Sequence, residues 1–278
     1  MLVNSKKVLE DAKAGKYAVL APDFVDLDSA RVYARTAQEK NIPVILSYAQ
    51  VFDKLGFLTL EEAAAVGKVV AESVHVPVVL HLDHGEDIEY VKRGVDLGFT
   101  SVMLDASMKS FEENVKMTKE IVDYAHAKGV TVEAEIGHVG QGENYSDYSN
   151  TDSVYTTVEE AVAFVEQTNV DSLAVSIGTA HGVYKSLENP VLNFERLKEL
   201  KDAVSVPLVL HGSSGSGDEN IRRCAKEGIT KFNLYTDFLL GAMDNINKEE
   251  PKDYMSVKKA ADQGMKDVIE HYLSLINE

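Results

Sequence analysis

The chain has 278 residues, a formal net charge of −17 and a pI of about 4.9, so it repels nucleic acids and anionic membranes as a whole, and we expect neither as a partner. Its single cysteine, Cys224, excludes an intrachain disulfide, and no apolar run reaches membrane-spanning length. The first residues lack a signal-peptide pattern, and these features together predict a cytoplasmic location.

Eight short apolar runs recur along the chain and predict strands. They span residues 17–25, 43–49, 77–84, 100–107, 130–138, 171–179, 207–214 and 229–236. Near-continuous apolar runs are typical of parallel strands that are covered on both faces. Between them, apolar residues recur at three- and four-residue spacing, which indicates amphipathic helices, for example over 111–129 and 157–169.

Alternation of strand and helix over eight units predicts an α/β fold, a TIM (β/α)8 barrel, as a single domain over residues 1–278. Its last part, residues 238–278, is predicted to be a helical extension with two helices separated at Pro251. The alternative is an open α/β sheet that binds a nucleotide. The glycine motifs of dinucleotide-binding folds and P-loops are both missing, which disfavours that alternative.

Histidines follow three of the predicted strands, at the barrel end where the active sites of TIM barrels lie. His84, His181 and His211 are therefore predicted to converge on one rim. Three histidines with an open fourth position are a common catalytic zinc arrangement, and Glu135 could replace or supplement a ligand. Each histidine taken alone could equally be a hydrogen-bonded structural residue.

Other polar residues accompany these histidines on the strands. Asp83 directly precedes His84, and His81 alternates with Leu80 and Leu82, which favours a structural role inside the barrel. Glu133 shares a strand face with Glu135. These two carboxylates either form a paired site, or one of them accepts hydrogen bonds in the barrel interior.

Two glycine-containing segments, "GTAHGVYK" and "HGSSGSG", suggest an anion site. Gly182 and Gly212 would let the backbone approach an anion closely, and Lys185 and Ser214 could donate hydrogen bonds to it. In TIM barrels a phosphate site often follows strands 7 and 8. The alternative is a tight Gly/Ser turn with the lysine in solvent.

The longest irregular stretch, residues 137–155, contains Glu143 between Gly142 and Asn144. Long ordered loops are often lids over a site. A carboxylate on such a loop is a plausible proton shuttle, whereas the simpler alternative is a solvated surface loop.

The segments "VVLHLDHG", "LAVSIGTAHGVYK", "PLVLHGSSG" and "KFNLYTD" resemble, in order and spacing, those of the class II ketose-bisphosphate aldolases. That family includes fructose- and tagatose-bisphosphate aldolases, and the resemblance extends from Lys16 to Asp237. It implies zinc-dependent, reversible aldol cleavage of a phosphorylated ketose to dihydroxyacetone phosphate and an aldehyde. It also implies a homodimer or homotetramer and allows an additional monovalent cation.

The resemblance also implies roles for individual residues. Asp83 matches the acid/base that handles the aldol hydroxyl proton, and Glu143 matches a loop glutamate that removes a proton from the ketone donor. The zinc ligands match His84, His181 and His211, with Glu135 able to join them. The pocket for dihydroxyacetone phosphate matches Gly182, Lys185, Gly212, Ser214, Asn233 and Thr236.

Several positions depart from the family pattern. Asp23 and Asp26 stand where asparagines are frequent, and Ala49 stands where a serine or threonine commonly faces the substrate. Tyr235 and Phe238–Leu239 replace acidic, small or basic residues after strand 8. Most of these changes surround the aldehyde half of the substrate. They lead to the hypothesis that the aldehyde is not glyceraldehyde 3-phosphate, or that a distal phosphate is bound weakly.

Three other functions remain open from the sequence. Lys231 lies inside a predicted strand and could form the Schiff base of a class I aldolase. A non-catalytic phosphosugar-binding barrel and a zinc hydrolase on the same fold are the other two. Retention of Asp83, Glu143 and the three histidines argues against a non-catalytic barrel.

Overall fold

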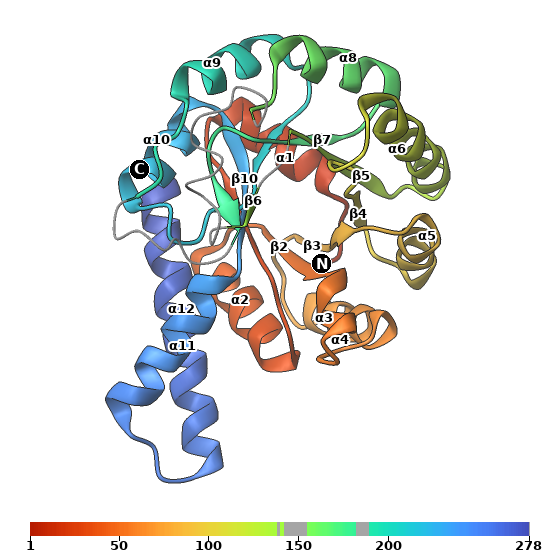
Figure 1. Cartoon of the computed structure of the whole chain (residues 1–278). Coiled ribbons are helices and arrows are strands. Elements are labelled where there is room, and N and C mark those ends of the chain that lie inside the picture. Colours follow the sequence, from red (N-terminus) through yellow and green to blue (C-terminus); the bar gives the residue numbers. More distant parts are fainter. Residues whose placement is uncertain (138–139, 142–154, 182–188, 278) are drawn as a thin grey trace.

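A computed structural model describes residues 1–137, 140–141, 155–181 and 189–277, with the backbone alone for residues 140–141 and His181. Eight parallel strands alternate with helices and form a nearly closed TIM barrel, as predicted (Figure 1). The barrel strands are β1 (Val19–Pro22), β2 (Val44–Ala49), β3 (Val78–Gly85), β4 (Ser101–Leu104), β5 (Thr131–Ile136), β7 (Ser172–Val175), β9 (Leu208–Leu210) and β10 (Ile229–Leu234).

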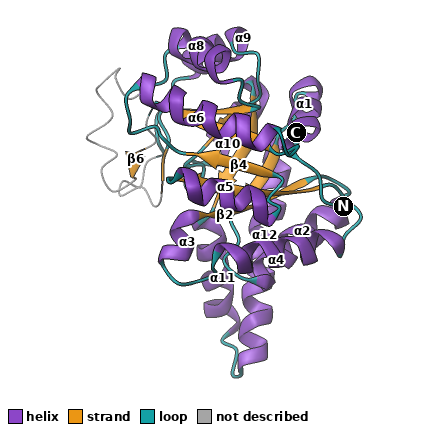
Figure 2. Cartoon of the chain, turned by 90° about the vertical axis from the view of Figure 1, so that its right-hand side faces the viewer, coloured by secondary structure: helices purple, strands orange, loops and turns teal. Residues whose placement is uncertain are grey.

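Helices surround the barrel and also extend beyond it. Those of the described residues are α1 (Ser5–Gly15), α2 (Leu27–Lys40), α3 (Gln50–Lys54), α4 (Leu60–Glu72), α5 (Ile88–Leu97), α6 (Phe111–His126), α8 (Val158–Thr168), α9 (Phe194–Ala203), α10 (Asp218–Glu227), α11 (Thr236–Glu249) and α12 (Tyr254–Ile276). The paired helices α11 and α12 project from the barrel, and α12 returns to pack along α2 and α10 (Figures 1 and 2). Within the described part of the chain, no helix is long and apolar enough to cross a bilayer.

The sheet runs in the order β1-β10-β9-β7-β5-β4-β3-β2, with every pair parallel. The barrel closes between β1 and β2, where the backbone N–H of Phe24 donates to the carbonyl of Ser47 at 2.9 Å. Because all strands point the same way, their C-terminal ends meet on one rim, and this rim carries the candidate site.

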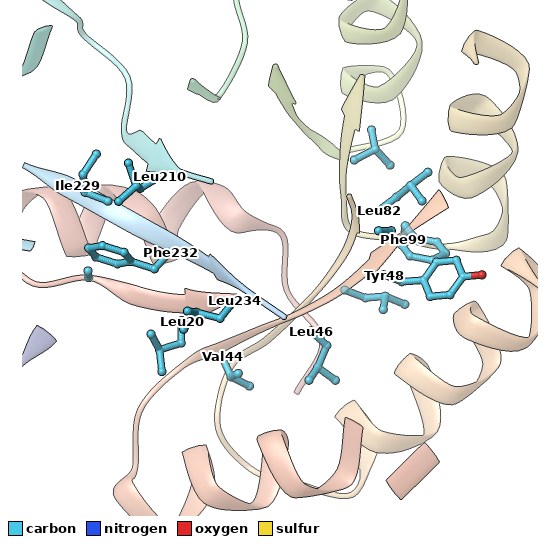
Figure 3. Close-up of a cluster of buried hydrophobic side chains, with 14 of the residues drawn as sticks. Leu20, Val44, Leu46, Tyr48, Leu82, Phe99, Leu210, Ile229, Phe232 and Leu234 are labelled. Carbon is cyan, nitrogen blue, oxygen red and sulfur yellow. The ribbon is translucent and has the colours of Figure 1, made fainter. Parts of the chain in front are cut away.

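The two faces of the strands differ in character. Side chains such as Leu46, Leu82 and Phe232 point outward and pack beneath the helices (Figure 3). The opposite face lines the barrel, where Val19, Ile45 and their neighbours pack against α1, which closes the N-terminal end. Above that apolar layer the interior is polar, unlike the branched apolar filling that dominates most TIM barrels.

Helix starts are specified locally. Asp26 is the N-cap of α2, and its Oδ1 accepts a hydrogen bond of 2.8 Å from the backbone N–H of Ser29. Such a cap contributes about 1 kcal/mol to stability. The position of Asp26 in the fold is therefore explained by helix capping.

The chain after β7 and the end of β10 differ from the sequence-based prediction. The predicted strand 171–179 ends at Val175, and Gly178, with a φ of 115°, turns the chain away. His181 then lies in β8 (Ala180–His181), which pairs with β6 (Gly140–Gln141) in a separate two-stranded sheet. The last barrel strand stops at Leu234, so that Thr236 begins α11.

Candidate active site

Asp83 and His84 are consecutive residues of β3, yet both line the same pocket. Regular alternation would point one of them outward. The register between β3 and β4 shifts between Leu82 and Gly85, and His84 has a φ of 44° in the left-handed region. An irregularity of this kind re-aims a side chain and often occurs beside active sites. Gly85 permits it, because a Cβ there would lie 2.7 Å from the carbonyl oxygen of Met103.

Carboxylates orient both described histidines of the predicted metal site. Nδ1 of His84 donates to Asp105 at 2.8 Å, and Nε2 of His211 donates to Glu133 at 3.1 Å. The remaining ring nitrogens, Nε2 of His84 and Nδ1 of His211, lie 2.8 Å apart. A carboxylate behind each imidazole is the usual support of metal-ligating histidines, since it fixes the tautomer and the ring orientation.

The arrangement fits a metal ion. Ligand atoms of Asp83, His84 and His211 all lie within 4.8 Å of one another, and so do those of His84, Asp105 and Glu135. Imidazole nitrogens together with carboxylate oxygens are a donor set that zinc accepts. The side chain of His181, the third predicted histidine ligand, lies outside what the structure describes.

The buried charges around this cluster are strongly coupled. Burial alone lowers the pKa of His84, but the carboxylates of Asp83 and Asp105 raise it to about 10. Burial raises the pKa of Asp83, but His84 and His81, together with His211 and Lys231, hold it well below its usual range. Asp83 is therefore ionised at neutral pH. Its Oδ1 accepts a hydrogen bond of 2.8 Å from Nδ2 of Asn233.

A buried ion pair lies directly beneath the site. Nζ of Lys231 lies 2.7 Å and 2.8 Å from the two oxygens of Glu133 and 3.2 Å from Nε2 of His81. Lys231 is 1% exposed and does not line the pocket, which argues against a Schiff-base lysine at this position. The structural role predicted for His81 is confirmed, since Nδ1 also bonds to Ser101 at 2.9 Å.

Hydrogen bonds from the C-terminal helices α11 and α12 hold the loop after β9 in place. Gly212, with a φ of 64°, admits no side chain, because a Cβ would lie 2.6 Å from the backbone of Ala180. Oγ of Ser214 accepts from the backbone N–H groups of Tyr235 and Asp237 at 3.3 Å and 3.4 Å. Oδ2 of Asp237 accepts from the N–H of Gly215 at 3.1 Å and from the hydroxyl of Tyr272. These bonds fix the loop against the start of α11, whose N-terminus has no side-chain cap and therefore suits an anion.

A pocket of about 450 Å³ opens above these groups. That volume is typical of small-molecule sites. Of the predicted site residues, those that line it are Asp83, His84, Glu135, Gly212, Ser214, Asn233 and Thr236. His211 lies against His84, with ring centroids 4.6 Å apart. Glu143, Gly182 and Lys185 lie outside the described residues.

Comparison with known proteins gives the family. The family model for class II fructose-bisphosphate aldolase matches residues 3–278. The chain belongs to this family. The resemblance seen in the sequence is thus confirmed, and the match extends beyond the barrel through the C-terminal helices.

Three solved structures that are named as aldolases or putative aldolases are similar to this chain. The YdjI aldolase from Escherichia coli K12 is 34% identical, with a TM-score of 0.88 over 99% of this chain and 97% of that chain. A putative fructose-1,6-bisphosphate aldolase from Coccidioides immitis is 28% identical, with a TM-score of 0.83 over 98% and 95%. Fructose-bisphosphate aldolase from Campylobacter jejuni is 25% identical, with a TM-score of 0.81 over 99% and 95%.

Some residues of this aldolase-family site could not be assigned from sequence. Glu133 supports His211 and neutralises Lys231, whereas its sequence signal was only the strand face that it shares with Glu135. Asp105 is the partner of His84, and its position at the end of a predicted strand was the available signal. Asp23 lines the pocket, and only its departure from the family pattern pointed to it.

Proposed function

We propose that this protein is a metal-dependent class II aldolase that reversibly cleaves a phosphorylated ketose to dihydroxyacetone phosphate and an aldehyde. One observation carries the proposal. Two carboxylate-supported histidines, His84 and His211, meet an ionised Asp83 beside a pocket of about 450 Å³, in a chain of this family.

Zinc is the proposed cofactor, held by His84, His181 and His211, with Glu135 as a supplementary ligand. When bound, zinc would supply a Lewis acid that polarises the ketone carbonyl. Asp105 and Glu133 support this role, because each fixes the tautomer of one ligand imidazole. A monovalent cation and a homodimer or homotetramer remain predictions of the resemblance.

Asp83 is proposed as the group that accepts the aldol hydroxyl proton. In the cleavage direction that proton passes to the carboxylate while the carbon–carbon bond breaks, and the electron pair stays with the donor half. The carboxyl group of Asp83 lines the pocket beside His84, where it can reach this proton. Asn233 holds one carboxylate oxygen in place at 2.8 Å.

The dihydroxyacetone phosphate half of the substrate is proposed to bind beside the loop that follows β9. Glu143 is proposed to exchange the proton beside the ketone carbonyl. The phosphate is proposed to bind at the loop after β9 and the start of α11, because the N-terminus of α11 has no side-chain cap. The proposed pocket for dihydroxyacetone phosphate as a whole consists of Gly182, Lys185, Gly212, Ser214, Asn233 and Thr236.

The test follows the donor half alone. Zinc-loaded and chelated protein are incubated with dihydroxyacetone phosphate in deuterated water, and deuterium incorporation is followed by NMR. We expect incorporation with zinc only, loss of both zinc and incorporation in H84A, and retention of both in H75A, a variant of an exposed histidine. Bound zinc without any incorporation would overturn the proposal.

A further inference from the structure

Asp23 follows the end of β1 and places a carboxylate in the pocket. Its backbone N–H donates to the carbonyl of Leu234 at 3.0 Å, and its partner across the barrel closure is Ser47. The residue is 8% exposed, and its Oδ1 is buried without a hydrogen-bond donor. Burial and the charge of Asp83 raise the pKa of Asp23 well above its usual range.

Asn233 supplies a second acceptor of the same kind. Its Nδ2 is committed to Asp83, while its Oδ1 is buried without a donor. Asn233 belongs to β10, which pairs directly with β1. A buried polar atom without a partner destabilises a protein by about 1–3 kcal/mol. The unpaired oxygens of Asp23 and Asn233 lie on neighbouring strands and line one pocket, so they suit a ligand that donates hydrogen bonds.

Several other side chains of the pocket are poorly suited to a phosphate. They are Ala49, Phe52, Tyr235 and the acidic Glu86. No lysine or arginine lines the pocket among the residues that the structure describes. Lys54, which contacts Glu86 at 2.7 Å, is neutralised by that pair.

In the segments that the structure does not describe, the sequence contains one lysine, Lys185, and no arginine. It is assigned above to the phosphate of the donor half. A second phosphate at the other end of the substrate would then lack a cation from this chain. Hydroxyl groups, by contrast, can donate to both unpaired oxygens.

We propose that Asp23 is the specificity-determining residue of the acceptor half, where it binds a hydroxyl group of an uncharged hydroxyaldehyde. The ketose would then carry one phosphate, on the dihydroxyacetone phosphate half, and an unphosphorylated, hydroxylated tail. This inference rests on the proposed aldolase function, and it concerns only the half of the substrate that donor exchange does not probe.

The test measures condensation of dihydroxyacetone phosphate with aldehydes that differ by one hydroxyl group. Glycolaldehyde is compared with acetaldehyde, and the ratio of their kcat/KM values gives the hydroxyl preference. We expect D23A to lower this ratio at least tenfold, while donor deuterium exchange changes less than twofold. D23N retains a carbonyl acceptor, so we expect it to keep most of the preference. E86Q removes a pocket charge, and the ratio should stay the same in it whatever happens to the absolute rates.

A purely structural role of Asp23 would lower both rates equally, and an unchanged ratio in D23A would overturn the proposal. The wild-type protein gives a second test that does not depend on a variant folding. Glyceraldehyde should be preferred over glyceraldehyde 3-phosphate, and the reverse preference would overturn the proposal. Absence of donor exchange in zinc-loaded wild-type protein would instead overturn the aldolase function itself.

Discussion

Lys231 and Glu133 form an ion pair in the centre of the barrel, with 2.7 Å between Nζ and Oε1 and each residue 1% exposed. Removing one partner leaves an uncompensated buried charge. We therefore expect K231M to lower the free energy of unfolding by about 3–5 kcal/mol. Denaturant unfolding measures this loss, with K40M as a control for a lysine in a partly exposed pair. An equal, small effect of both substitutions would contradict the prediction.

The same pair predicts a loss of stability in acid. Burial alone would raise the pKa of Glu133, but Lys231 and the hydrogen bond from His211 hold it below its usual value. The unfolded chain therefore takes up this proton at a higher pH than the folded protein. The contribution of Glu133 is fully present above a pH of about 4.3 and is lost as pH falls further. Unfolding measured from pH 7 to pH 3 should show a shallower acid decline in E133Q than in the wild type.

Glu133 is also expected to influence metal affinity through His211. Since its Oε1 accepts from Nε2 of His211, E133Q weakens the support of that imidazole. Loss of such a partner typically reduces metal affinity about 10–100-fold. Competition with a zinc chelator measures this affinity, and E159Q, a change on an exposed helix position, should leave it unaltered. Wild-type affinity in E133Q would show that Glu133 serves the ion pair alone.

Asp83 should affect bond cleavage far more than donor exchange. D83N preserves shape and removes the base, so we expect cleavage to slow by about 10²–10⁴-fold. Deuterium exchange into dihydroxyacetone phosphate should continue, because a different group is proposed to carry that proton. Comparing the two rates in one preparation checks this. Equal losses of both would assign Asp83 to the donor half.

Tyr272 is expected to position the loop after β9, the proposed phosphate site, without contacting the phosphate itself. Its hydroxyl donates to Asp237, which in turn accepts from the N–H of Gly215. Y272F removes one hydrogen bond, which contributes about 0.5–1.5 kcal/mol. We expect KM for dihydroxyacetone phosphate to rise by about 2–10-fold with kcat little changed. A fall in kcat alone would argue against a role at the phosphate.

The sequence predicted what depends on local pattern. Eight apolar runs and the helices between them defined the barrel, and His84 and His211 were placed because parallel strands end on one rim. The separate strand that carries His181 was not predicted, because it depends on a turn at Gly178 and on pairing with β6.

Contacts between distant strands were the other missing part. The bond between Glu133 and Lys231 joins residues 98 positions apart, and no periodicity encodes it. The resemblance placed both Asp83 and His84 in the site, but strand alternation alone would point one of them outward, and the register shift against β4 was not predicted. That Oδ1 of Asp23 is buried without a hydrogen-bond donor also depends on the folded structure and could not be predicted from the sequence.

The position of Tyr272 has a consequence for synthesis of the protein. It lies near the end of α12, yet its hydroxyl reaches a residue that holds the loop after β9. All eight barrel strands precede α12 in the chain, so they are synthesised before it. The barrel strands can therefore pair before α12 is available, whereas the proposed phosphate site is completed only when α12 docks.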